Sequence, residues 1–414
     1  MSGRDSLDPL TVMLPRPDVP LSPRQKWTIV SAAWGVGMIA AAFAFVGPVL
    51  ALILEERTGS GEFIGLFATV GALTTVTLTP LGPWLMKTFP ARALVIVSLL
   101  GTAVCFPLYY LAEDPNLWFA IRFVQGIFMT VTFVTSETWI NDVAPEKMRG
   151  RILGFYAIFL AGGLGIGAAA AAWLIAAVGL TGWEAFAIGA GIALAGLLPY
   201  ASSKQMPLQP PEGDHAKPLA LLSIMRDSPG LMATVFAFGA VEFCLFHFLP
   251  VYGVRLGYSE AAAAALLLAL PVGNILLVYP IGMLADRFSR HRVLGALFAV
   301  CTLAPLLAAS VTGYATLMVV LSAFIGAAAG LYTVGLAILT ERHKAGRIAA
   351  ANAAFIMCYG LGSLVSPYGV GAAMDRAGPD GMLFVMAGLV GLGWLAFAVF
   401  ERHRAVDLDR RDAI

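Results

Sequence analysis

Long apolar runs separated by short polar segments cover most of the 414-residue chain. A helix needs about 20 mostly apolar residues to cross a bilayer. Twelve segments meet this condition, with approximate bounds 28–53, 62–86, 93–112, 116–140, 152–177, 181–201, 230–254, 260–283, 292–311, 314–340, 349–374 and 381–400. Glycine and proline occur inside several runs, which a bundle tolerates because neighbouring helices satisfy the freed backbone groups. The pattern predicts an all-α membrane protein with twelve transmembrane helices.

The composition agrees with this prediction. Hydrophobic residues make up 59% of the chain and charged residues only 12%, whereas soluble domains carry about 25% charged residues. The net charge is +1, and the basic residues are dispersed through the polar segments without an aromatic-interleaved patch. We therefore expect the lipid bilayer as the environment and no nucleic-acid partner.

An internal repeat divides the chain into halves. Pro80-Leu81-Gly82 and Pro280-Ile281-Gly282 lie 200 residues apart, as do Arg122 and Ser322, each followed by a glycine four residues on. Parallel repeats are typical of transporters that hold their substrate between two halves near the bilayer midplane. The predicted units are two six-helix bundles, a linker between them and two tails: tail 1–26, bundle 27–201, linker 202–228, bundle 229–400 and tail 401–414.

The distribution of basic residues predicts the orientation. With a cytoplasmic N-terminus, 22 of the 26 lysines and arginines fall on the cytoplasmic side, as the positive-inside rule requires. The first 26 residues contain no long apolar run, so no cleavable signal peptide is expected. We expect a multi-pass protein of the bacterial inner (plasma) membrane with both termini in the cytoplasm.

The loop from Gly282 to Arg290 reads G-M-L-A-D-R-F-S-R. It resembles the G-x-L-a-D-R-x-G-R signature of the major facilitator superfamily of secondary transporters. In that family the signature between helices 2 and 3 is the stronger copy, whereas here the first copy has Met86 in place of the aspartate. The resemblance implies alternating access, a small or medium solute bound between the halves, and proton coupling. We also expect a monomer without a cofactor.

A second loop element resembles the same family. Asp142 to Arg151 reads D-V-A-P-E-K-M-R-G-R, similar to the acid-x-x-P…R-G element found after helix 4. The resemblance implies a cytoplasmic gate in which residues of both loops hold that side closed, formed by Asp142, Arg149, Arg151, Gly282, Asp286, Arg287 and Arg290. The alternative is a solvated loop that only sets the topology.

Two further patterns extend the interpretation. The stretches E-T-W-I-N from Glu137 and L-P-V-Y-G from Leu249 are similar to a branch of YcaD-like transporters, which implies no particular substrate. The run G-G-L-G-I-G from Gly162 predicts close helix packing, because small residues let backbones approach.

Glu242 lies 13 residues after Pro229 and 10 before Tyr252, which places it near the bilayer centre. A charged side chain there costs about 2.5 to 3.5 kcal/mol, so its presence is a functional hypothesis. One interpretation is a proton- or cation-coupling carboxylate, and the other is a hydrogen-bonded acid that ties two helices together. His247 is about 140° further round the helix, so we expect it to have other surroundings and a structural role, with a place in the proton pathway as the alternative.

Arg122 and Gln125 form an R-x-x-Q-G stretch that resembles helix 4 of proton-coupled family members. Because arginine stays charged, Arg122 should face a cavity or a carboxylate, where it would bind an anionic substrate or tune a proton site. The alternative is snorkelling to the interface. Glu137 lies about 22 Å further along the helix, so it lines the same cavity or pairs with Arg149 or Arg151.

The chain is not expected to be an enzyme. It has no H-E-x-x-H, G-x-S-x-G or paired-cysteine motif. Its four cysteines stand singly in different apolar segments, so neither a disulfide nor a metal site is expected. The remaining alternative to a transporter is a receptor or scaffold with the same fold and no solute flux.

Overall fold

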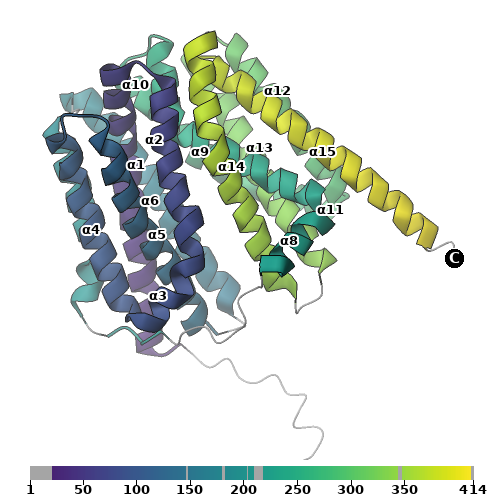
Figure 1. Ribbon diagram of the computed structural model, residues 1–414, viewed down its shortest axis with the longest axis horizontal. Coiled ribbons are helices and arrows are strands. Elements are labelled where there is room, and N and C mark those ends of the chain that lie inside the picture. Colours follow the sequence, from purple (N-terminus) through teal and green to yellow (C-terminus); the bar gives the residue numbers. More distant parts are fainter. Residues whose placement is uncertain are drawn as a thin grey trace, which may run out of the picture.

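The computed structural model describes residues 21–145, 148–179, 182–202, 204–208, 218–343 and 347–411. Within these ranges every regular element is a helix, and the helices form two bundles side by side (Figure 1). The predicted fold class, an all-α membrane protein in two halves, is confirmed.

The described residues of the first half form seven α-helices: α1 (Pro23–Thr58), α2 (Gly61–Leu78), α3 (Gly82–Thr88), α4 (Ala91–Leu111), α5 (Leu117–Val143), α6 (Arg149–Val178) and α7 (Trp183–Ala195). A 3-10 turn, Thr79–Leu81, joins α2 to α3, and the three elements together correspond to the predicted segment 62–86. The side chain of Ser22 caps α1 by accepting a hydrogen bond from the backbone of Gln25.

Where the structure describes the second half, it has eight α-helices: α8 (Pro218–Asp227), α9 (Pro229–Arg255), α10 (Glu260–Ala265), α11 (Ala269–Arg287), α12 (Arg290–Ser310), α13 (Tyr314–Arg342), α14 (Ile348–Ala377) and α15 (Gly381–Arg411). The 3-10 turn Leu266–Leu268 joins α10 to α11. Eleven helical segments of the described chain are long and apolar enough to cross a membrane.

The twelfth predicted segment, 181–201, is shorter as a regular helix than expected. Helix α7 ends at Ala195 and a 3-10 turn covers Leu198–Ala201. Pro199 explains this end, because a proline ring clashes with the carbonyl four residues earlier and supplies no N–H to it. That carbonyl, of Ala195, instead accepts a hydrogen bond of 2.9 Å from the indole of Trp34 on α1.

Two boundaries differ from the sequence prediction. The predicted linker 202–228 contains the helix α8 in its last part, while residues 209–217 lie outside the described residues. The last helix, α15, continues to Arg411, so the segment 401–414 begins as helix and not as a separate tail. Figure 1 shows α15 extending well beyond the second bundle.

Glycines set the closeness of the central helix pairs. A Cβ on Gly163 or Gly167 of α6 would lie 2.2 Å from a carbonyl oxygen of α1, which no packing could accept. The same holds in the second half, where a Cβ on Gly362 of α14 would lie 2.2 Å from the carbonyl oxygen of Phe236 on α9. The close packing predicted from the Gly162–Gly167 run is therefore confirmed. The same kind of close glycine contact occurs in both halves, as expected for an internal repeat.

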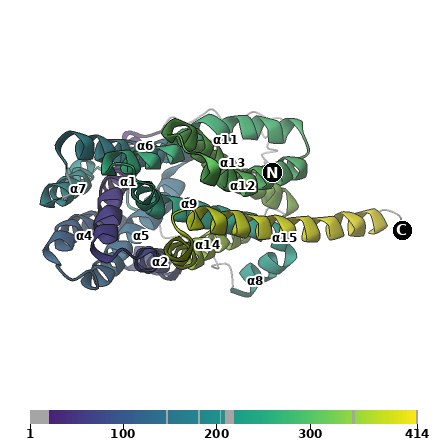
Figure 2. The same ribbon diagram turned by 90° about the horizontal axis from the view of Figure 1, so that it is seen from above.

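Contacts between the halves run mainly through two helix pairs, α2 with α14 and α6 with α10. The view from above shows α2 beside α14, with α4 and α7 on the outer side of the first half (Figure 2). In Figure 1 the halves meet at the end where α10 lies and diverge toward α3 and α8.

Candidate functional site

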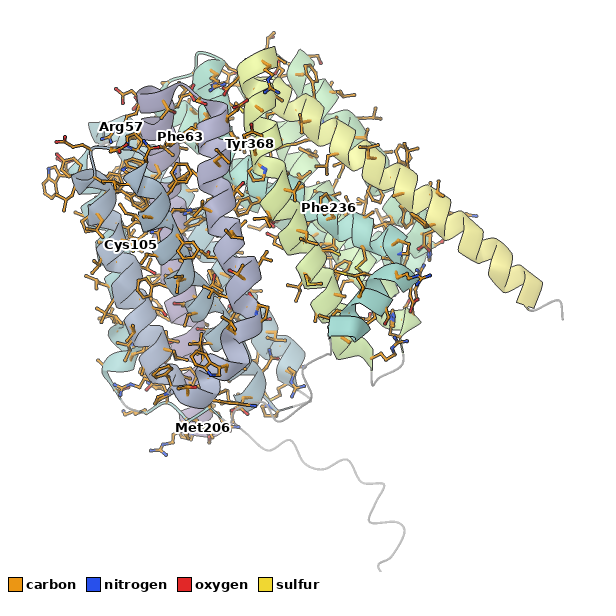
Figure 3. The ribbon with its side chains drawn as sticks, viewed as in Figure 1. Arg57, Phe63, Cys105, Met206, Phe236 and Tyr368 are labelled. Carbon is orange, nitrogen blue, oxygen red and sulfur yellow. The ribbon has the colours of Figure 1, made fainter. Side chains whose placement is uncertain are left out.

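The two halves are joined by ion pairs where α1 and α9 end. Arg255, the last residue of α9, binds Glu55 of α1 at 2.7 Å and Asp375 of α14 at 2.9 Å. The side chain of Arg255 is only 15% exposed, so these pairs are partly shielded from water. We call this the Arg255 end of the molecule; it also carries the labelled residues Arg57 and Phe63, and Met206 lies at the opposite end (Figure 3).

Asp375 also caps a helix of the other half. Its carboxylate accepts hydrogen bonds from the backbone N–H of Gly61 at 2.7 Å and of Glu62 at 3.0 Å, in the first turn of α2. A carboxylate at a helix N-terminus is stabilised by the unpaired N–H groups and the helix dipole. The Arg255 end is therefore closed by contacts that hold α2 against α14.

The predicted gate residues lie at the opposite end, which we call the Arg290 end. Asp286 binds Arg290 at 3.6 Å, and Arg290 also binds Glu341, so these pairs remain within the second half. The guanidinium of Arg287 lies over the ring of Phe288. Gly282 is on α11 and faces open space.

The first-half members of the predicted gate are in the same region. Asp142 lies in the last turn of α5, and Arg149 and Arg151 are exposed at the start of α6. The structure thus places the seven residues at one end. Among the described residues, neither Arg149 nor Arg151 forms an ion pair with the second half. The gate stays a prediction for a state in which the halves approach at this end.

Glu242 lies in the middle of α9 and faces α14. The hydroxyl of Tyr359 donates a hydrogen bond of 2.9 Å to its carboxylate. Aromatic rings surround this pair, because Phe238 lies 5.7 Å from the ring of Tyr359 and 5.5 Å from that of Tyr332. An acid among tyrosines has a hydrogen-bond partner in either protonation state.

Glu137 lies on α5 of the first half and is exposed. No ion pair joins it to Arg149 or Arg151 within the described part of the chain. Glu137 and Glu242 therefore belong to different halves, on α5 and α9.

Arg122 on α5 is brought to His247 on α9. A guanidinium nitrogen of Arg122 lies 3.0 Å from Nε2 of His247, and the side chain of Arg122 is 4% exposed. The snorkelling alternative therefore does not describe this structure. Gln125 lies one turn further, where it accepts a hydrogen bond of 3.0 Å from Tyr109 and one of 3.5 Å from Arg122.

The expectation that Glu242 and His247 have different surroundings is confirmed, since they contact α14 and α5 respectively.

Several residues of this region were not singled out from the sequence. Arg255 and Asp375 are 120 positions apart, and Tyr359 is 117 positions from Glu242. A signal existed for Arg255, because it is one of only three basic residues that the orientation rule leaves outside. Nothing in the local sequence distinguishes Tyr359 from the other tyrosines of the apolar runs.

Comparisons with known proteins identify the family. The sequence matches the model of the Major Facilitator Superfamily over residues 32–278 and 256–412. It is 24% identical over 361 residues to the uncharacterized MFS-type transporter YfkF of Bacillus subtilis, covering 85% of this chain and 90% of the relative. It is 27% identical over 278 residues to the MFS-type transporter YcaD of Escherichia coli, covering 67% and 70%.

Solved structures show the same fold. The structure of the nucleoside transporter NupG has a TM-score of 0.73 at 14% identity and covers 91% of this chain and 99% of that one. A bacterial homologue of the human lysosomal transporter Spinster, in an inward-facing and unoccupied conformation, has a TM-score of 0.69 at 15% identity and covers 92% and 98%. The chain belongs to the Major Facilitator Superfamily, and it is a multi-pass membrane protein of a family that transports solutes. The YcaD-like resemblance is confirmed as a relationship.

Proposed function

We propose that this chain is a secondary active transporter that moves a small or medium solute by alternating access and couples the movement to protons at Glu242. The family supports solute transport. The observation that carries the coupling proposal is the carboxylate of Glu242, which lies in mid-helix and is held by Tyr359 at 2.9 Å.

The surroundings of Glu242 suit a group that gains and loses a proton. Its carboxylate has no ion pair with a described lysine or arginine, so no strong electrostatic bond has to break when a proton arrives. The hydroxyl of Tyr359 donates to the ionised acid and can also accept from the protonated acid. Both forms are thereby hydrogen-bonded, and buried polar groups without a partner are costly.

The contacts between the halves support alternating access. The Arg255 end is closed by pairs from Arg255 to Glu55 and to Asp375, whereas Asp286 and Arg290 at the Arg290 end bind partners within their own half. Partly shielded, charge-assisted pairs of this kind contribute about 1 to 3 kcal/mol, which is little enough for them to break during a cycle. With the Arg290 end in the cytoplasm, as the positive-inside rule indicates, this is an inward-facing state.

The remaining parts of the proposal concern location and assembly. Bacterial relatives and the basic residues of the loops support the bacterial inner membrane with both termini cytoplasmic. We propose a monomer, because the two halves of one chain supply both sides of the region between them. NupG is a nucleoside transporter, but at 14% identity it supports only the broad class of small-molecule solutes.

A solute screen followed by a flux measurement tests the proposal. A bound solute raises the thermal midpoint of the purified protein by mass action, which selects candidates from a library. We expect the selected solute to cross proteoliposome membranes faster when a pH gradient is imposed, and to move protons as it crosses. Binding without any flux would identify a receptor or scaffold and would overturn the proposal.

A further inference from the structure

The side chain of Arg122 is almost completely enclosed, with 4% of it exposed. Its guanidinium lies over the rings of Phe43 at 5.1 Å and of Phe67 at 5.2 Å. Gly71 of α2 provides the space on another side, since a Cβ there would lie 2.8 Å from Nε. Arg122 is therefore fixed by helices α1, α2 and α9 as well as by its own helix.

This positive charge is not neutralised. Among the residues that the structure describes, no carboxylate lies within 4.0 Å of the guanidinium, and its Nε has no hydrogen-bond partner. A buried charge without an opposite charge is strongly unfavourable. The two aromatic faces offset only part of this cost, because a cation–π contact contributes about 0.5 to 2 kcal/mol.

His247 does not supply the missing negative charge either. Its Nδ1 lies 2.8 Å from the carbonyl oxygen of Phe243, and a carbonyl only accepts, so Nδ1 carries the hydrogen. Nε2 is then a lone pair that accepts from Arg122 at 3.0 Å, which requires a neutral ring. His247 orients the guanidinium and leaves its charge unchanged.

A small pocket adjoins the guanidinium. It contains about 20 Å³ of free space, roughly the room of one water-sized group. Its walls come from both halves and are apolar except for Arg122 and His247, with Phe43, Phe67 and Phe246 as the large members. The rings of Phe43 and Phe246 stack across the boundary between the halves, with centroids 4.8 Å apart.

We propose that Arg122 binds the carboxylate of an amphipathic organic anion. A carboxylate oxygen enters the small pocket beside the guanidinium, and the apolar part lies outside the pocket, against the partly exposed rings of Phe43 and Phe246. One guanidinium without a counter-ion fits one negative charge, and its planar donors match a carboxylate. The partly exposed rings of Phe43 and Phe246 offer an apolar surface that an aliphatic or aromatic body can contact. This inference names the substrate class of the transporter proposed above and rests on that function.

Matched acids and amides test the site directly. The probes are benzoate, octanoate and 1-naphthoate, each paired with its primary amide, which keeps the shape and removes the charge. Binding to the full chain in detergent is measured by calorimetry and thermal shift. We expect at least one acid to bind about tenfold more tightly than its amide, the ratio that a charge-assisted hydrogen bond supplies.

Variants of Arg122 test whether this residue causes the preference for the acid over its amide. Arg122→Gln should remove the preference for the acid, and Arg122→Lys should retain part of it. Arg57→Gln is the matched control, because Arg57 also lies over an aromatic ring, that of Trp118 at 5.2 Å, but outside the pocket. It should leave the preference unchanged.

Equal affinity for every acid and its amide in the wild type would overturn the proposal, and this comparison remains valid if Arg122→Gln fails to fold. An acid preference that persists in folded Arg122→Gln would overturn it as well. Binding is measured without a membrane or a gradient, so its outcome does not depend on proton coupling. A failure of proton coupling and a failure of the anion site are therefore separate results.

Discussion

Arg255 of α9 donates to both carboxylate oxygens of Glu55 of α1, with distances of 2.7 Å from Nε and 2.9 Å from Nη2. The two residues belong to different halves, so this fork-shaped contact exists only while the halves meet at the Arg255 end. Two parallel bonds fix the geometry more firmly than one. The contact thus stabilises one state of the transporter relative to others.

Arg255→Gln should therefore open this end. We expect the state seen here to lose about 1 to 3 kcal/mol relative to the alternative, because the bonds lost are charge-assisted and partly buried. Distances between spin labels on the first turn of α2 and the last turn of α14 should broaden toward longer values.

Arg376→Gln is the matched control for that experiment. Arg376 binds Glu62 across the same boundary at 3.0 Å, but its side chain is 75% exposed, and exposed pairs contribute about 0 to 1 kcal/mol. Its distance distribution should stay close to that of the wild type. Equal broadening in the two variants would show that burial of Arg255 is not what closes this end.

Gly65→Ala should hinder the approach of α2 to α14. A Cβ at Gly65 would lie 2.4 Å from the carbonyl oxygen of Pro367, so the helices must separate, at a cost of about 1 to 3 kcal/mol. Gly369→Ala is the control on α14, where a Cβ meets nothing within 4 Å. Cysteines placed near the Arg255 end should react faster with a membrane-impermeant maleimide in Gly65→Ala only. Unchanged rates would contradict the packing argument.

Met86→Asp tests the position where the first loop copy lacks its acid. The side chain of Met86 is 5% exposed, so the structure favours a packing role over a gate role. We expect Met86→Leu to cost less than about 1.5 kcal/mol, while Met86→Asp costs about 1 to 3 kcal/mol more because it buries a polar group. Thermal unfolding midpoints of the two variants check this prediction. Equal midpoints would contradict the argument that position 86 is buried and has a packing role.

The sequence predicted the parts of this structure that depend on local pattern. Apolar runs predicted the eleven long spans of the described chain, and the twelfth run is present as the shorter helix α7, which ends early because of Pro199. The position of Glu242 along α9 predicted its depth, and the helical spacing predicted that Glu242 and His247 have different surroundings. The contacts between the halves could not be predicted from the sequence. The capping of Gly61 by Asp375, for example, depends on how the two bundles are rotated relative to each other. Such a rotation leaves no periodic trace in the sequence.

Asp286→Ala tests the predicted gate at the Arg290 end. In this structure the side chain of Asp286 is 78% exposed and pairs at 3.6 Å, so removing it should leave this state almost unaffected. Asp286→Ala should instead destabilise the other state, in which the gate forms, by about 1 to 3 kcal/mol if the pair is shielded there. Spin-label distances across the Arg290 end should therefore show a larger share of the state seen in this structure. Identical distributions in wild type and variant would leave the loop with a topological role only.

The central claim is that Glu242 couples transport to protons, and Glu242→Gln tests it most directly. Glutamine keeps the shape and accepts the hydrogen bond from Tyr359, but it has no proton to exchange. Glu184→Gln is the control, since Glu184 is an exposed carboxylate at the start of α7. The measurement is solute flux into proteoliposomes with and without an imposed pH gradient. We predict that Glu242→Gln binds the solute but loses the flux driven by the gradient, while Glu184→Gln keeps it. Gradient-driven flux of wild-type size in Glu242→Gln would contradict the account.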